Sequence, residues 1–262
     1  MPKELFYDVD LWLILVASIG VFLLATEAGF LLGRRSQSTN DDNSKSQIYT
    51  IQGAALGLLA LLLGFTFAMA MSRYDIRKQM VLDESNAIGT TFLRAQLLPE
   101  PTRQEVSNLL RRYVELRLEL HAAGNDQKRL REARNQAERL QNQLWAYGVA
   151  MGEKDPRAVT TGLFLQSLNE MIDLHAKRLN AQENHVPEIT LVLLFFVAFM
   201  ATGLIGYGCG LSGLRNFFVT IISSILIAAV IMVIMDLDRP SRGLIRVSQQ
   251  RMIDLRDSLK EQ

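Results

Sequence analysis

The chain contains few residues whose type and spacing suit catalysis or metal binding. Its three histidines, His121, His175 and His185, show no metal-ligand spacing. Asp173 and His175 are two residues apart, so a helix places them on different faces. The sequence has no nucleotide-binding loop, no activated-nucleophile motif and no zinc signature. We therefore expect no enzyme and no resident cofactor, and we expect the histidines to be surface or packing residues.

Glu27 is the one acidic residue well inside an apolar segment, and an acid in such a place suggests a functional role. It also lies about two helical turns before Arg34 and Arg35, so it could pair with them near a membrane interface. Both interpretations stay open. The single cysteine, Cys209, rules out an intrachain disulfide, and the net charge of +1 gives no reason to expect a nucleic acid partner.

Four long apolar segments determine the fold class. They cover residues 11–32, 54–71, 189–208 and 217–235, and each has about the ~20 residues that a helix needs to cross a bilayer. We predict an all-α integral membrane protein with four transmembrane helices, in preference to a soluble protein with four buried helices. The first segment has no cleavage motif after it, so we expect a permanent span and not a signal peptide.

The polar segments complete the predicted domain organisation. Residues 1–71 hold the first two spans and a polar loop, 33–50, whose composition over 33–47 is typical of a mobile linker. Residues 72–187 form a helical domain. Within it, Gly124 and Asn125 end one helix, and another helix runs from about Pro156 to Asn184. Residues 188–235 hold the last two spans, with Pro187 at the start of the third, and 236–262 form a helical tail in which Pro240 starts the helix.

Basic residues near the ends of the spans indicate the orientation. Four spans place both termini and the polar domain on one side of the membrane, and that side has more lysine and arginine. We therefore expect a cytoplasmic polar domain. The cations on that side are Lys3, Arg73, Arg77, Lys78, Lys177, Arg178, Arg239, Arg242 and Arg246, and those on the other side are Arg34, Arg35, Lys45 and Arg215.

The second span contains two rows of residues at helical spacing. One row consists of small residues, which favours close helix packing, and comprises Gly53, Gly57, Ala60, Gly64 and Ala68. The other row consists of the bulky apolar residues Leu61, Phe65 and Met69, four residues apart. Rings of such residues from several subunits can form a constriction that blocks ions by dewetting. The spacing leaves both interpretations open.

A resemblance favours the second interpretation. The segment "LLGFTFAMAMSRYDIR", Leu62 to Arg77, resembles the second transmembrane helix of bestrophin channels. The shared positions are Leu63, Gly64, Phe65, Arg73 and Tyr74. Over nearly the whole length, the chain is similar to the bacterial bestrophin-like family of membrane proteins, whose features occur here as "ESNAIGTTFLRAQLLP", "SLNEMID" and "DLDRPSRGLI".

This resemblance implies a pentameric ion channel in a bacterial inner membrane, with a pore lined by the second span. The apolar neck would be formed by Gly57, Leu61 and Phe65, but the glycine has no side chain to close a ring. Either the constriction is shorter here, or Met69 supplies the missing ring at the other end, or this branch has lost the gate. The alternative function is a non-conducting scaffold or regulator whose cytoplasmic helices bind a protein partner. The expected surroundings are therefore a lipid bilayer and further copies of this chain, with an unidentified cytoplasmic partner on the alternative interpretation.

The resemblance also implies two sites of charged residues. Asp236 and Asp238 stand where animal bestrophins bind calcium, although calcium needs six to eight oxygens and Arg239 would oppose a cation. We favour a structural clasp, in which Asp238 pairs with Arg239 or a neighbouring chain. At the pore exit, Arg73 and Arg77 favour anions, and the acids that offset them are Asp75, Asp83 and Glu84.

Overall fold

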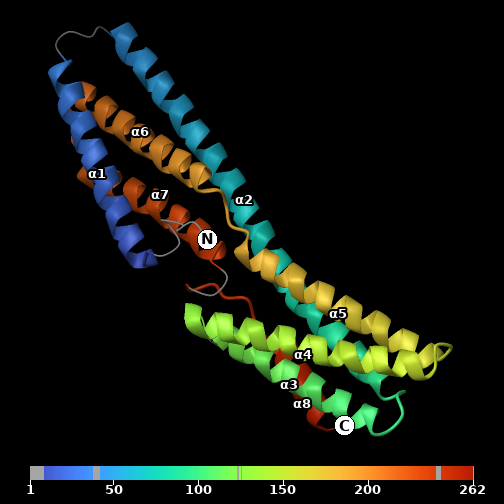
Figure 1. The fold of residues 1–262 in the computed structure, drawn as a ribbon. Helices are drawn as coiled ribbons and strands as arrows, with labels where there is room; N and C mark the ends of the chain where they lie inside the picture. The colour runs from blue at the N-terminus through green and yellow to red at the C-terminus, as the bar shows by residue number, and fades with distance from the viewer. Residues whose placement is uncertain (1–8, 38–41, 123, 125, 240–242, 262) are drawn as a thin grey trace. The chain divides into compact units, whose positions relative to one another are not determined.

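The computed structural model describes residues 9–37, 42–122, 124, 126–239 and 243–261. Within these ranges all regular structure is helical (Figure 1). The helices are α1 Leu11–Arg35, α2 Asp42–Ala95, α3 Thr102–Ala122, α4 Gln127–Lys154, α5 Val159–Glu183, α6 Glu188–Ser212, α7 Phe217–Leu237 and α8 Gln250–Lys260.

Two compact units divide the chain. The membrane unit comprises residues 1–72 and 185–239, and the polar unit comprises residues 73–184 and 240–262. Helix α2 contributes its first part to the membrane unit and its second part to the polar unit. The four segments long and apolar enough to cross a membrane are α1, the first part of α2, α6 and α7, as the sequence predicts.

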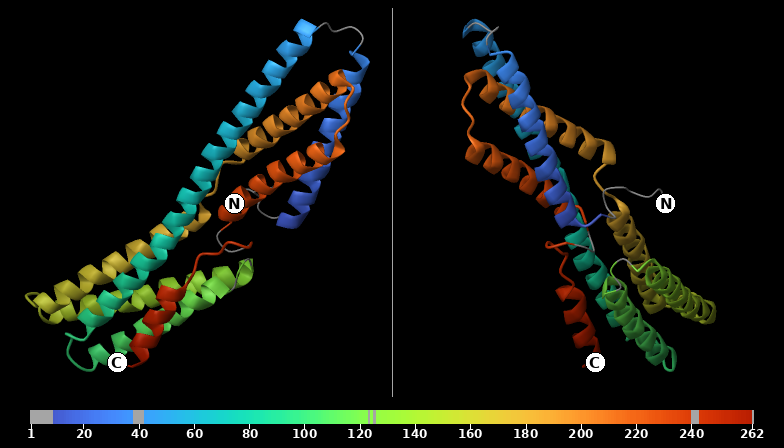
Figure 2. Two further views of the ribbon diagram at one scale, coloured as in Figure 1. Left: turned by 180° about the vertical axis from the view of Figure 1, so that it is seen from behind. Right: turned by 90° about the vertical axis from the view of Figure 1, so that its left-hand side faces the viewer.

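The membrane unit is organised around the contact of α1 with α6, and α7 also packs on α1 (Figure 2). The contact of α1 with α6 is close enough for backbone to touch backbone. A Cβ atom added to Gly29 would lie 2.0 Å from the carbonyl oxygen of Gly203, and one added to Gly206 would lie 1.9 Å from that of Thr26. Gly33 and Gly210 make equally close approaches. Only glycine fits at these positions, because any side chain would displace one helix from the other.

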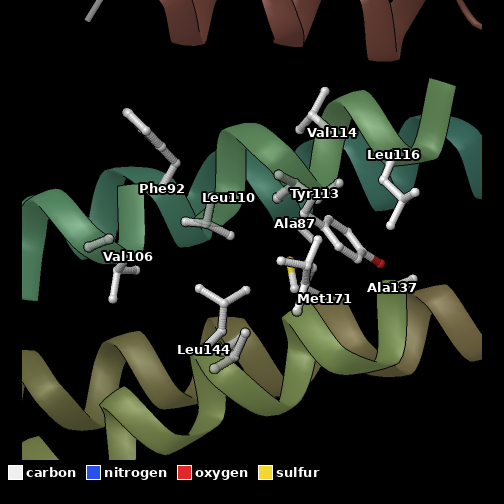
Figure 3. Close-up of a cluster of buried hydrophobic side chains, with 14 of the residues drawn as sticks. Ala87, Phe92, Val106, Leu110, Tyr113, Val114, Leu116, Ala137, Leu144 and Met171 are labelled. Carbon is white, nitrogen blue, oxygen red and sulfur yellow. The ribbon is translucent and has the colours of Figure 1, made fainter. Parts of the chain in front are cut away.

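The polar unit has an apolar core built from α2, α3, α4, α5 and α8. Leu110 and Tyr113 of α3 lie against Leu144 of α4 in one layer of buried side chains (Figure 3). Met252 and Leu259 bring α8 onto the same core. The helices begin and end where local signals favour it: the side chain of Asp126 caps α4 by accepting hydrogen bonds from two backbone N–H groups, and Gly124 has a left-handed backbone between α3 and α4.

Two predicted boundaries differ from the structure. Helix α2 begins at Asp42, so the prediction of a loop through residue 50 was wrong. The reason is that Tyr49 extends the packed part of α2, with its hydroxyl 3.4 Å from the carbonyl oxygen of Gly208 in α6. In the tail only residues 250–260 are helical, and residues 243–249 have no helix. Pro240 and Asn125 lie outside the described residues.

The contact between α1 and α6 yields a test of the fold. Replacing Gly206 with alanine forces a methyl group onto the Thr26 carbonyl, and such overpacking costs about 1–3 kcal/mol. We expect the G206A variant to unfold at a lower temperature in detergent, as measured by intrinsic fluorescence. Gly20→Ala on α1 is the control, because no described atom lies within 4 Å of an added Cβ there. Equal melting temperatures for the two variants would show that the close contact is absent.

Candidate functional site

The first part of α2 has three distinct faces. Leu59, Thr66 and Ala70 form a face buried within the chain, with exposed fractions of 2%, 3% and 0%. The row of bulky apolar residues is exposed, with fractions of 54% for Leu61 and 64% for Phe65. The row of small residues is exposed as well. At 3.6 residues per turn, the centres of the three faces lie roughly 100–140° apart around the helix.

The small row of α2 is not covered by the residues that the structure describes. A Cβ atom added to Gly53, Gly57 or Gly64 would have no described atom within 4 Å, and Ala60 and Ala68 are exposed. Any close helix packing by this row must therefore involve another chain. The packing role of Gly53, Ala60, Gly64 and Ala68 and the pore role of Gly57, Leu61, Phe65 and Met69 remain predictions.

The two arginines predicted at the pore exit bind the end of α5. The Nε–H and Nη2–H groups of Arg77 donate to the carbonyl oxygens of Ala181 and Asn184, at 3.0 and 2.9 Å. Arg73 donates from Nη1 to the side-chain oxygen of Asn184. A helix C-terminus carries partial negative charge, so a guanidinium is well placed there. Arg77 is only 3% exposed.

At the end of α7, Asp238 holds the segment that leads into α6. Its carboxylate accepts a hydrogen bond from the backbone N–H of Val186 at 2.6 Å, and its carbonyl oxygen lies 3.0 Å from Nδ1 of His185. Asp236 and Asp238 are 2% and 1% exposed. Among the described residues, no group of three or more histidine, cysteine, aspartate or glutamate side chains is placed to hold a metal ion. These contacts of Asp238 lie within its own chain, and both the structural clasp through Arg239 or a neighbouring chain and the calcium site remain predictions.

Glu27 has a different partner from the one the sequence suggests. Its carboxylate lies 2.6 Å from Nη2 of Arg215, in the turn between α6 and α7. Of the two interpretations left open, pairing thus involves Arg215 and not Arg34 or Arg35, and a functional role of Glu27 stays a prediction. The guanidinium of Arg215 also lies over the rings of Phe30 and Phe217, at 5.0 and 4.2 Å from their centroids. Proximity in sequence favoured Arg34 and Arg35, but the hairpin of α6 and α7 brings Arg215 closer.

A buried cluster of charged residues in the polar unit was not predicted from the sequence. Glu84 of α2 is fully buried, and it binds Arg117 of α3 at 2.8 Å and Arg178 of α5 at 2.5 Å. Tyr113 of α3 lies 3.4 Å from the same carboxylate and 3.1 Å from Nδ1 of His175. Two glutamines extend the network: Gln141 donates to the Tyr113 hydroxyl at 3.1 Å, and Gln249 accepts from Arg178 at 2.6 Å.

The arginines determine the charge of Glu84. Burial alone would raise the pKa of its carboxyl group, but the charge of Arg117, the hydrogen bond with His175 and the charge of Arg178 outweigh burial, so the pKa lies well below its usual range. Burial and the nearby Glu84 charge raise the pKa of Tyr113 above its usual range, so its hydroxyl keeps its proton. Glu84 is therefore an ion held between two arginines. This differs from our prediction that Glu84 offsets the charges of Arg73 and Arg77 at a pore exit.

Comparisons with known proteins agree with this architecture. Residues 19–252 match the sequence profile of the Bestrophin-like domain. Among solved structures, the crystal structure of a variant of a bacterial bestrophin homolog from Klebsiella pneumoniae is similar, with a TM-score of 0.68 and 14% identity over 97% of this chain and 98% of that one. A second crystal structure of a bacterial bestrophin homolog from Klebsiella pneumoniae, solved by Zn-SAD phasing, has a TM-score of 0.66 and 13% sequence identity, over 96% of this chain and 98% of that one. No curated protein sequence matches significantly.

The contacts of Asp238 lead to a test of calcium binding. In Asp238→Asn the acceptor for Val186 becomes neutral, and weakening a buried hydrogen bond of this kind costs about 1–3 kcal/mol. We expect the melting temperature to fall equally in the presence of calcium and of a chelator. Glu170→Gln, which removes one negative charge from an exposed position, is the control. Calcium-dependent stabilisation of the parent that disappears in Asp238→Asn would instead establish a metal site.

Proposed function

The chain belongs to the bestrophin-like family, and from this we propose that it forms a homo-oligomeric ion channel whose pore is lined by α2. A pentamer is the favoured assembly. The observation that carries the proposal is the exposed surface of α2 in the membrane unit, where neither the small row nor the bulky row is covered by the same chain.

The composition of this surface argues against simple contact with lipid. Lipid-facing surfaces gain from large apolar side chains, whereas a row of glycine and alanine allows the backbone of another helix to approach closely. The small row of α2 therefore suits a neighbouring copy of the chain. The bulky row lies on an adjacent face, so a ring of copies that packs through the small rows can direct Leu61, Phe65 and Met69 towards a common axis.

A ring of these side chains would form the neck of the pore. A narrow apolar passage dries easily, and a dry passage blocks hydrated ions without any charged gate. Gly57 contributes no side chain, so the constriction depends on Leu61 and Phe65, with Met69 as a further ring. Ion selectivity is not part of the proposal, because Arg73 and Arg77 are bound to the end of α5 and Glu84 is buried.

We place the polar unit in the cytoplasm and the membrane unit in a bacterial inner membrane. The basis is the positive-inside rule, because the segments on the side of the polar unit contain more lysine and arginine. Arg77 and Arg178 count although they are buried in the folded protein, since the rule acts while the chain inserts into the membrane. A cysteine at the exposed position Asn135, in a Cys209→Ser background, is expected to react with an impermeant thiol reagent only in opened cells. Labelling of intact cells would reverse the orientation.

The neck provides the test of conduction. In the double variant Leu61→Ala with Phe65→Ala, smaller side chains widen and wet the passage, so current through reconstituted bilayers is expected to rise by about tenfold or more, a barrier change of ~1.4 kcal/mol. The oligomer is expected to remain intact in size-exclusion chromatography. The protein is used at full length.

The matched control replaces the same two residue types on another exposed surface. Leu226 and Phe218 of α7 are 60% and 73% exposed, similar to Leu61 and Phe65. Their double alanine variant is expected to conduct like the parent. If Leu61→Ala with Phe65→Ala instead yields a less stable oligomer that still does not conduct, the small and bulky rows serve packing, and the protein is a scaffold.

A further inference from the structure

Arg215, in the turn between α6 and α7, is held in place by three side chains. Its Nη2–H group donates to the carboxylate of Glu27 at 2.6 Å, and its guanidinium lies over the rings of Phe30 and Phe217. The arginine side chain is nevertheless 43% exposed. A guanidinium has five N–H groups, so after the bond with Glu27 this fixed cation keeps donors for a further acceptor.

Two more arginines end α1 beside this turn. Arg34 follows Phe30 by four residues, which is one helical turn along the same face of α1. Its backbone nitrogen would lie 2.7 Å from a Cβ atom added to Gly210, near the end of α6 and five residues before Arg215. Arg34 and Arg35 are both exposed. We call Arg34, Arg35 and Arg215 the arginine corner of the membrane unit.

The charges of Arg34 and Arg35 are not neutralised by an acidic side chain among the residues that the structure describes. Both lie in the last turn of α1, where the helix end carries a partial charge of about −0.5. This partial charge offsets only part of two full positive charges. The arginine corner therefore presents uncompensated positive charge on an exposed surface.

The length of α1 places the arginine corner at the depth of lipid headgroups. About 33 Å of helix separates Trp12 from Arg34, close to the ~30 Å of hydrocarbon in a bilayer. Trp12 is 59% exposed, and exposed tryptophan is typical of a membrane interface. With Trp12 at one interface, Arg34 and Arg35 reach the other.

Large apolar side chains are exposed next to the three arginines. Leu31 lies one turn before Arg35 on α1, and Leu214 and Phe218 flank Arg215, with exposed fractions of 53%, 72% and 73%. Such side chains suit contact with acyl chains. Cations beside an exposed apolar surface match a molecule that has an anionic group next to a hydrocarbon chain.

We propose that the arginine corner binds the phosphate of an anionic phospholipid. Guanidinium groups bind phosphate oxygens through paired, charge-assisted hydrogen bonds. Glu27 positions Arg215 for this contact, and Arg34 and Arg35 supply the charge that favours a lipid with net negative charge over a zwitterionic one. The site lies within the membrane unit of one chain and requires neither a pore nor conduction, so it can be tested even if the channel proposal fails.

The probe is the melting temperature of the full-length protein in detergent micelles that contain dioleoyl phosphatidylglycerol or dioleoyl phosphatidylcholine. Above the dissociation constant, each tenfold rise in the mole fraction of phosphatidylglycerol is expected to raise the melting temperature by roughly 3–6 °C. Phosphatidylcholine has the same acyl chains and is expected to have no such effect. Inorganic phosphate, which lacks acyl chains, is expected to have none either.

The double variant Arg34→Gln with Arg35→Gln is expected to lose the dependence on phosphatidylglycerol. Its melting temperature without lipid is expected to match that of the parent, because both side chains are exposed. The matched control is Arg131→Gln with Arg139→Gln, which removes the same charge from exposed positions on α4 and is expected to keep the dependence.

Cross-linking gives an independent result. In nanodiscs with a photoactivatable phosphatidylglycerol, the parent is expected to be labelled on peptides that contain Arg34 or Leu214. Labelling confined to other peptides would overturn the proposal. An equal response to phosphatidylcholine or to inorganic phosphate, or an unchanged dependence in the Arg34 and Arg35 variant, would do so as well. If that variant loses its oligomer in lipid-free micelles, the arginines bind another copy of the chain and not a lipid.

Discussion

The ion pairs of Glu84 are the interaction on which the polar unit depends. One carboxylate on α2 is bound by arginines of α3 and α5, and through Tyr113 and Arg178 the network reaches Gln141 of α4 and Gln249 ahead of α8. Removing Glu84 would leave two buried arginines without its charge, and breaking a buried ion pair in this way costs about 3–5 kcal/mol. Apolar packing alone would tolerate several helix registers. The network favours a single register, because its ion pairs and hydrogen bonds form only when the helices are aligned in that register.

The membrane unit is held together by a different interaction. Lipid offers apolar side chains the same environment as a protein interior, so burial alone does not bring helices together there. The contact of α1 with α6 relies instead on glycines that bring two backbones together, with Gly29 against Gly203 and Gly206 against Thr26. The two units therefore derive their stability from different physical sources, which explains why their sequences look so different.

Much of the fold could be predicted from the sequence, because span length and helical periodicity are local properties. The four spans, the all-helical polar unit and the stop at Gly124 follow from such signals. The partners of charged residues did not follow, since they depend on contacts between distant segments: Arg215 pairs with Glu27 across 188 residues and Arg178 with Glu84 across 94. One signal was available but unused, namely the four-residue spacing of Gly29 with Gly33 and of Gly206 with Gly210.

Glycine serves two different purposes in the membrane unit, so its presence alone does not identify a pore. In α1 and α6 the space beside each close-contact glycine is filled by a neighbouring backbone of the same chain, whereas beside Gly57 and Gly64 of α2 no described atom lies within 4 Å.

A dimer could fill the space beside α2 but would leave the adjacent bulky row, Leu61 and Phe65, facing lipid or the partner's small residues. A ring of copies resolves this conflict, because neighbours cover the small rows on the sides while the bulky rows meet at the centre. The placement of two exposed rows on adjacent faces of α2 thus favours a closed ring over a two-helix contact, and an apolar constriction at the centre of such a ring is one way in which channels are gated.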